Sequence, residues 1–131
     1  MWSQNQARLF KHPDPQGSLV LPRDHGPHPD FRTEWWYFTG WFKSGTEQLG
    51  VQITFFRSAP DVDLSNPSRF NPKQLLIAHV AIAGPIKSVL VHDQIALRAQ
   101  KGEAEISGSN AECLNIRIPK WSLSSKDGSV W

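Results

Sequence analysis

A single carboxylate beside a run of aromatic residues offers the clearest candidate for chemistry in this sequence. Glu34 directly precedes Trp35, Trp36 and Tyr37, and Trp41 follows four positions later. A carboxyl group packed against aromatic side chains loses hydration, so its pKa rises and it can serve as a general acid. Aromatic faces also attract a cation that protonation creates. The pattern predicts proton donation to an unactivated carbon–carbon double bond, with Glu34 as the catalytic group and a ligand site lined by Trp35, Trp36, Tyr37 and Trp41.

A structural role for Glu34 is the alternative. An ion pair with Arg32 or Arg57 would lower the pKa of the carboxyl group and hold the strand in place. The sequence leaves both interpretations open.

Polar residues gather in the loop at residues 22–30, just before Glu34. Three prolines and a glycine make the backbone irregular there, and rigid loops of this kind often position functional groups. Asp24 and His25 are therefore candidate proton-transfer residues. His25 and His28 with a carboxylate would also suit zinc or iron, but their spacing alone does not define a metal motif. We expect a hydrogen-bonded network here and no metal site.

The remaining candidates are weaker. His79 lies in an apolar segment, where it is either a core histidine with a hydrogen-bond partner or part of the ligand site. His92 and Asp93 are adjacent in a strand and point to opposite faces, so they do not act on one substrate together. Cys113 is the only cysteine, which excludes a disulfide within the chain and favours a small buried side chain. The sequence has no serine-hydrolase or nucleotide-binding motif.

Charge and composition narrow the function classes. The 131 residues carry 14 Lys and Arg and 12 Asp and Glu, a net charge of +2, without a basic run that would follow a phosphate backbone. We therefore expect no nucleic acid partner. The N-terminus lacks a basic segment followed by an apolar one, and no segment approaches about 18 continuous apolar residues. The sequence as given predicts a soluble chain without an export signal and leaves its location open.

Short strands are the elements that must position these residues. Residues 31–42 alternate between two faces, with Trp35 and Tyr37 on one and Glu34 and Trp36 on the other. Both faces are apolar, so we expect a layer to cover each of them. Alternation and turn signals predict further strands at residues 49–57, 75–84, 88–97, 103–107, 113–118 and 120–125, and a turn at 126–131 that enters another strand.

The chain as a whole reads as one all-β domain. No segment of ten or more residues shows a sustained helical period, which predicts an antiparallel barrel or sandwich, incomplete at the C-terminus. Residues 1–22 read as an irregular lead-in, and residues 23–131 as a partial domain. The long loop at residues 58–74 contains three prolines and is of the kind that forms a lid or a rim.

The motifs around Glu34 resemble a known family, the carotenoid 1,2-hydratases, which include hydroxyneurosporene synthase and the AttH-like lipocalin-type proteins. Asp-His-Gly-Pro-His-Pro at residues 24–29 and Glu-Trp-Trp-Tyr at residues 34–37 are similar to the N-terminal half of that family. The resemblance implies a lipocalin-like barrel, in which this chain supplies most of the first of two domains, and a second domain or partner chain that closes the sheet. The other similar segments are residues 50–57, 66–70, 74–81 and 90–94.

The same resemblance implies a function. Hydratases of this family add water across a carbon–carbon double bond of an acyclic carotenoid without a redox cofactor, and members are often labelled secreted hydrolases. It therefore implies an apolar ligand, a carotenoid or another isoprenoid, and no cofactor, with this chain inactive by itself. The alternative is a lipocalin-like carrier that binds an apolar ligand without changing it. Family members are commonly exported or associated with the cell envelope.

Overall fold

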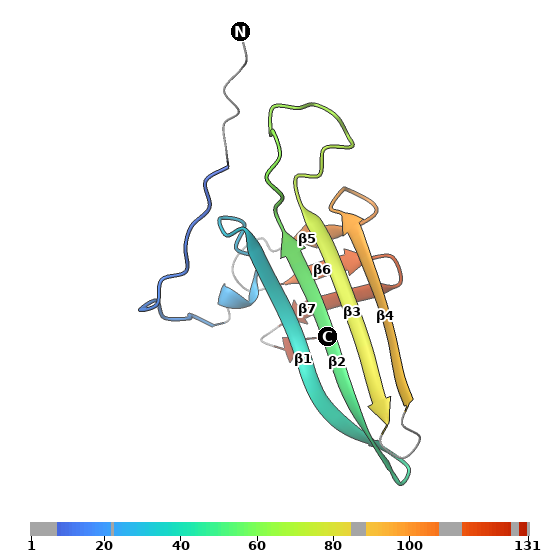
Figure 1. Cartoon of the computed structure of the whole chain (residues 1–131). Coiled ribbons are helices and arrows are strands. Elements are labelled where there is room, and N and C mark those ends of the chain that lie inside the picture. The colour runs from blue at the N-terminus through green and yellow to red at the C-terminus, as the bar shows by residue number, and fades with distance from the viewer. Residues whose placement is uncertain (1–7, 22, 85–88, 108–113, 127–128, 131) are drawn as a thin grey trace.

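The computed structural model describes residues 8–21, 23–84, 89–107, 114–126 and 129–130. This part of the chain is all-β, as predicted, and contains no α-helix (Figure 1). No helix in it is long and apolar enough to cross a membrane. Its elements are one short 3-10 turn followed by strands: η1 (Arg23–His25), β1 (Thr33–Ser44), β2 (Glu47–Ser58), β3 (Leu75–Gly84), β4 (Val89–Arg98), β5 (Glu105–Ser107), β6 (Asn115–Ile118), β7 (Trp121–Lys126) and β8 (Ser129–Val130).

The strands form two four-stranded antiparallel sheets. Hydrogen-bonded neighbours follow chain order in both, β1-β2-β3-β4 in the first sheet and β5-β6-β7-β8 in the second. The β1–β2 hairpin turns in two residues, because Ser44 pairs with Glu47, and Gly45 has a φ of 62° at the first turn position. Glycine adopts such a φ without steric strain and is favoured at this position of a two-residue hairpin. The connection between the strands predicted at residues 31–42 and 49–57 is therefore shorter than expected: β1 ends two residues later, and β2 begins two residues earlier.

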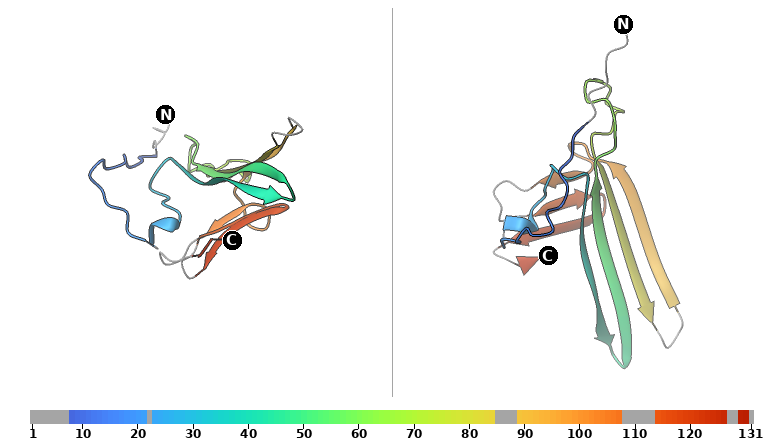
Figure 2. Two further views of the ribbon diagram at one scale, coloured as in Figure 1. Left: turned by 90° about the horizontal axis from the view of Figure 1, so that it is seen from below. Right: turned by 60° about the vertical axis from the view of Figure 1, so that its left-hand side comes forward.

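The core lies between the two sheets. Trp36, Phe55, Ala78 and Ile95 are direct neighbours across β1 to β4, and this row packs into the core. The described strands of the two sheets share no hydrogen-bonded ladder, so the layers form an open sandwich rather than a closed barrel (Figure 2). Apolar burial at about 25 cal/mol per Å² holds the layers together. The second sheet contributes four buried side chains from around β6 and β7: Leu114, Ile116, Ile118 and Leu123.

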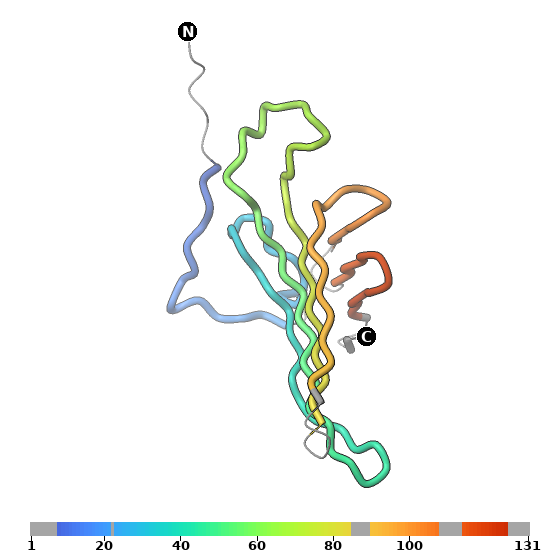
Figure 3. Tube along the Cα trace, turned by 45° about the vertical axis from the view of Figure 1, so that its right-hand side comes forward, coloured from blue at the N-terminus to red at the C-terminus, as the bar shows by residue number. Residues whose placement is uncertain are grey.

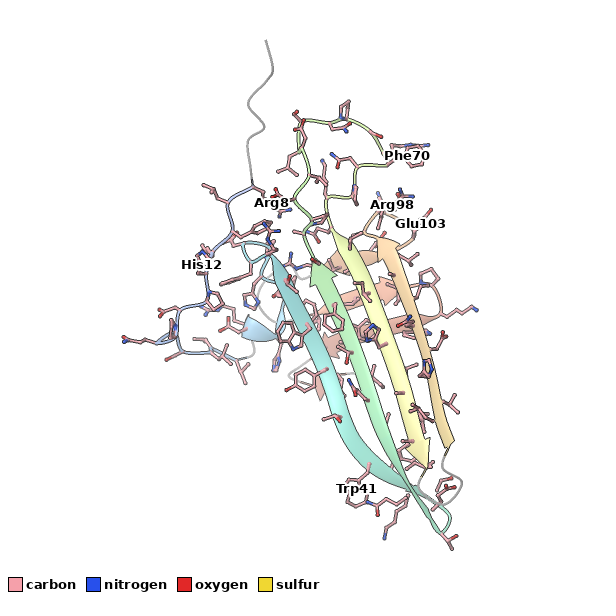
Figure 4. The ribbon with its side chains drawn as sticks, in the orientation of Figure 1. Arg8, His12, Trp41, Phe70, Arg98 and Glu103 are labelled. Atoms are coloured by element: carbon pink, nitrogen blue, oxygen red, sulfur yellow. The ribbon has the colours of Figure 1, made fainter. Side chains whose placement is uncertain are left out.

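The second sheet covers only one side of the first. We call that side of β1–β4 the inner face, and the opposite side, which carries Trp35, Phe56 and His79, the outer face. The outer face is turned toward the viewer in Figure 4, with the second sheet behind it. Trp35, Tyr37 and Trp41 of the outer face are 57%, 60% and 64% exposed. The prediction that both faces of β1 are covered is therefore wrong for the described part of the chain, because the only packing layer there lies against the inner face.

The first sheet also extends beyond the second (Figure 2, Figure 3). β1 and β2 have 12 residues each, whereas β6 has four and β5 three. At the far end of the β1–β2 hairpin, Phe42 and Ile82 are therefore exposed on the inner face. The loop between β2 and β3, expected over residues 58–74, projects from the other end of the sheet (Figure 1).

The described segment before the sheets, residues 8–21, contains no helix or strand and is attached to the loop that precedes β1. The backbone N–H of Lys11 donates to the carbonyl oxygen of Asp30 at 2.9 Å, and the Lys11 ammonium lies 2.6 Å from the Asp30 carboxylate. The division of the chain at residue 22 stays a prediction. Cys113 and the turn residues 127–128 lie outside the described residues.

Candidate functional site

Glu34 lies on the inner face of β1, and both of its carboxylate oxygens are engaged. Oε2 accepts a hydrogen bond from Nε of Arg57 at 2.7 Å. Oε1 accepts one from the backbone N–H of His28 at 2.7 Å and lies 2.6 Å from Nδ1 of the same residue. Arg32, the other predicted partner, is exposed and lies 3.9 Å from Asp61. The geometry therefore matches the ion-pair interpretation, and the role of Glu34 as a general acid stays a prediction.

Arg57 is the buried cation at the centre of this network. Its side chain is 1% exposed and stands opposite Glu34 in the β1–β2 register, while the Glu34 side chain is 13% exposed. Nη2 of Arg57 donates to the carbonyl oxygens of His28 and Phe31 at 2.9 and 2.8 Å. A buried charge requires such partners, because its desolvation costs several kcal/mol. Arg57 thereby connects the loop before β1 to the second strand of the sheet.

His28 stands between two carboxylates. Its Nδ1 faces Glu34, and its Nε2 lies 3.6 Å from Oδ1 of Asp24. Asp24 in turn accepts hydrogen bonds from Nε of Arg23 and from the backbone N–H of Val20, each at 2.7 Å. The hydrogen bond from Arg23, followed by that from Val20, holds the pKa of Asp24 well below its ordinary value. We call Asp24, His28, Glu34 and Arg57 the polar array.

Sequence reasoning gave too little weight to His28 and Arg57. His28 has a signal in the Asp-His-Gly-Pro-His-Pro motif, and Arg57 ends the strand predicted at residues 49–57, which pairs with the strand of Glu34. In the part of the chain that the structure describes, no group of three or more His, Cys, Asp and Glu side chains is placed to hold a metal ion. Hydrogen bonding and ion pairing account for the contacts within the array.

Replacing Asp24 with Asn is expected to change how the free energy of unfolding depends on pH. Because the pKa of Asp24 is lower in the folded chain than in the unfolded chain, its ionised form contributes stability above the unfolded value of about 3.9. That contribution is lost as the pH falls below this value. The difference in unfolding free energy between wild type and Asp24→Asn should therefore be constant near neutral pH and shrink below about pH 4. Urea denaturation at a series of pH values measures it.

Asp61→Asn is the matched control for this prediction. Asp61 is exposed and lies 3.9 Å from Arg32, so its removal should change stability little at any pH in the series. A difference for Asp24→Asn that stays constant from neutral pH down to about pH 2 would show that Asp24 does not carry the proton linkage.

An apolar cavity of about 220 Å³ lies between β1 and the second sheet. Trp36 forms one wall, and its indole N–H donates to the carbonyl oxygen of His25 at 3.0 Å. This hydrogen bond satisfies the polar end of the indole and leaves its ring faces for apolar contact. The cavity is lined by His25, Trp36, Tyr37, Phe38, Leu114, Leu123 and Ser125.

A larger hollow of about 460 Å³ lies elsewhere on the molecule. It is open and lined largely by polar residues of the segments before β3 and after β4, such as Lys73, Gln74, Gln100 and Lys101. It contains none of the residues predicted for the site. The smaller cavity is therefore the candidate ligand site, since its lining is apolar and includes predicted residues.

The predicted site residues on the inner side fall into two adjoining groups. His25 and Trp36 line the cavity, and Tyr37 borders it although alternation places its side chain on the outer face. Asp24 and Glu34 belong to the polar array. Asp24 lies on the loop that carries His25, and Glu34 lies on the strand that carries Trp36. The loop before β1 thus contributes both to the cavity wall, through His25, and to the array.

Trp35, Trp41 and His79 lie on the outer face instead. The ring centroid of Trp35 is 6.3 Å from that of Phe56, which is 5.4 Å from that of His79. Side chains alternate along a strand, so Trp35 cannot share a cavity with its neighbour Trp36. The ligand-binding role assigned to the three residues stays a prediction, and any ligand they bind is separate from one in the cavity.

An open antiparallel β-sandwich with an apolar cavity between its layers places this chain among the lipocalin-like proteins. The family model described as AttH-like matches residues 12–130, and the chain belongs to that family. A search of curated proteins found no match.

A solved structure supports the same assignment. The crystal structure of a protein provisionally assigned as AttH, from Nitrosomonas europaea, has 38% sequence identity and a TM-score of 0.69. The alignment covers 87% of this chain and 32% of that one, so the chain spans about a third of the length of its solved relative. These matches identify the AttH-like family and do not identify the chain as a carotenoid hydratase.

Proposed function

We propose that the chain forms the ligand-holding part of a lipocalin-like carrier for an apolar isoprenoid. The cavity beside Trp36 is the observation that carries the proposal, since four apolar or aromatic side chains from both sheets converge on it: Trp36, Phe38, Leu114 and Leu123. Glu34 is not among the lining residues, and its oxygens are engaged by His28 and Arg57. Apolar walls without a free acid favour binding over catalysis.

The size of the cavity suggests how a long ligand would lie. Cavities that enclose a whole drug-sized ligand measure roughly 300–1,000 Å³, and this one measures about 220 Å³. It therefore suits one end of a polyene. Phe38, which lines the cavity, is followed on the inner face by Phe42, whose side chain is exposed beyond the second sheet. The rest of the polyene would lie along this uncovered apolar strip.

The test is incubation of the chain with lycopene, followed by removal of free pigment and mass spectrometry of what remains bound. Unchanged lycopene should copurify with the protein. Leu123→Phe fills the cavity and should weaken binding by at least about tenfold, because a close-packed interior has no spare room. Leu90→Phe, an equal change at an exposed position of β4, should bind as wild type does. Absence of binding, or equal binding by Leu123→Phe, would overturn the carrier proposal.

Hydration of the polyene is the second candidate, and the polar array supports it. His28 stands between Asp24 and Glu34 on the loop that also lines the cavity through His25, so titratable groups and the ligand site share one segment. In that reaction the double bond gains a proton at one carbon, water attacks the resulting cation, and the water then releases a proton. A hydroxylated product in the same incubation would favour this candidate over the carrier.

A further inference from the structure

The outer face of the first sheet has the composition of a protein interface. By alternation, Lys43 lies at one end of it and Arg98 at the other, and no Asp, Glu, Lys or Arg lies between them. Trp35, Tyr37 and Trp41 are exposed at its β1 edge, and Figure 4 shows Trp41 there. Interface cores are depleted in charge and enriched in tryptophan and tyrosine, and exposed apolar patches on soluble proteins commonly mark interaction sites.

Three exposed aromatic side chains supply about half of the surface that one partner contributes to a standard interface. Large aromatic side chains present roughly 150–250 Å² each when fully exposed, and these three are 57–64% exposed. Together they offer roughly 300–450 Å² of aromatic surface, against about 800 Å² per partner in a standard interface. The exposed polar side chains Gln52, His92 and Gln94 of the neighbouring strands lie on the same face and bring the total closer to that value.

The order of large and small side chains across the outer face suits packing against the same face of a second copy. The register sets Trp35, Phe56, Ile77 and Ala96 in one row across the sheet, with the large side chain at the β1 edge and the smallest at the β4 edge. A two-fold axis parallel to the strands would place β1 of one copy over β4 of the other. Trp35 would then pack on Ala96 of the second copy, and Ala96 would in turn contact Trp35 of that copy. Without carboxylates or internal cations, the face can meet itself without charge repulsion.

From these observations we propose that the outer face is a homodimer interface, at which two copies pack sheet on sheet about 10 Å apart. Trp35 and Trp41 are its anchors. The proposal does not depend on the cavity or on any ligand, because the two sites lie on opposite faces of the sheet. A carrier so assembled would present two cavities on its outer flanks.

Sedimentation equilibrium over a range of protein concentrations tests the proposal. Wild-type protein should sediment as a dimer. Trp35→Ser/Trp41→Ser should raise the dissociation constant of the dimer by at least about hundredfold, because buried tryptophans contribute a large share of the binding energy at protein interfaces. Phe42→Ser is the matched control, since Phe42 is an exposed aromatic residue of the same strand on the inner face. It should leave the dimer intact. Far-UV circular dichroism checks that each variant is folded.

A second variant keeps the proposal testable if Trp35→Ser/Trp41→Ser does not fold. Gln94→Glu places a carboxylate at an exposed position of the outer face, where it would be buried on dimerisation, so it should give a folded monomer. A monomeric wild type at every concentration would overturn the proposal, as would dimers that persist in both outer-face variants. Dissociation by Phe42→Ser alone would place the contact on the inner face. Saturable binding of a polysaccharide by the monomer, lost in Trp35→Ser/Trp41→Ser, would assign the outer face to another occupant.

Discussion

Arg57→Met is expected to lower the free energy of unfolding by about 3–5 kcal/mol, the cost of removing one partner from a buried ion pair. The change leaves the carboxylate of Glu34 without its cation and removes two donors to backbone carbonyls of the loop before β1. Domains are commonly stable by only about 5–15 kcal/mol, so the loss is a large part of the total. Urea denaturation monitored by tryptophan fluorescence measures it.

Arg32→Met is the matched control for this change. Arg32 is also an arginine next to the same loop, but its side chain is exposed and its nearest carboxylate lies at 3.9 Å. Such a surface contact contributes about 0–1 kcal/mol. Similar losses from the two replacements would mean that the buried pair does not hold the loop to the sheet.

Phe55→Ala should destabilise the sandwich by about 3–5 kcal/mol, the usual cost of emptying the space of a buried phenylalanine. Phe55 is 3% exposed and belongs to the core that joins the two sheets. Its removal opens a cavity under Trp36 and Ala78, its neighbours in the sheet register. The same urea titration reports the loss, and melting temperature should fall with it.

The adjacent residue provides the control for the core. Phe56→Ala removes the same side chain from the outer face, where it is only partly buried, and should cost roughly half as much or less. The comparison is made at protein concentrations low enough to keep the chain monomeric. Equal costs for Phe55→Ala and Phe56→Ala would contradict the assignment of inner and outer faces.

Local patterns predicted the strands because hydrophobic alternation is a local property. β3 begins and ends at the predicted residues, 75 and 84. β1 is shifted by two residues from the prediction and β2 is longer than predicted, since the polar residues Ser44 and Glu47 pair across a two-residue turn. A polar pair at a hairpin end leaves no apolar signal, so only the backbone geometry at Gly45 reveals it.

Contacts between distant segments were less predictable. The sequence offered Arg32 and Arg57 as partners of Glu34, and only the register of β1 against β2 decides between them. Leu123 of β7 and Leu114, just before β6, line the cavity and carry no spacing signal that links them to Trp36. An apolar strand also does not reveal how many of its faces are covered, which is why the exposure of Trp35 was not foreseen.

A double-mutant cycle on Glu34 and Arg57 tests most directly the claim that Glu34 serves to hold the loop to the sheet. The unfolding free energies of Glu34→Gln, Arg57→Met and the double replacement are compared with wild type. We predict a coupling energy toward the upper end of the range of about 0.5–3 kcal/mol that contacting residues show, with the double replacement less destabilised than the sum of the two single ones. Additivity of the two changes within about 0.5 kcal/mol would contradict the account.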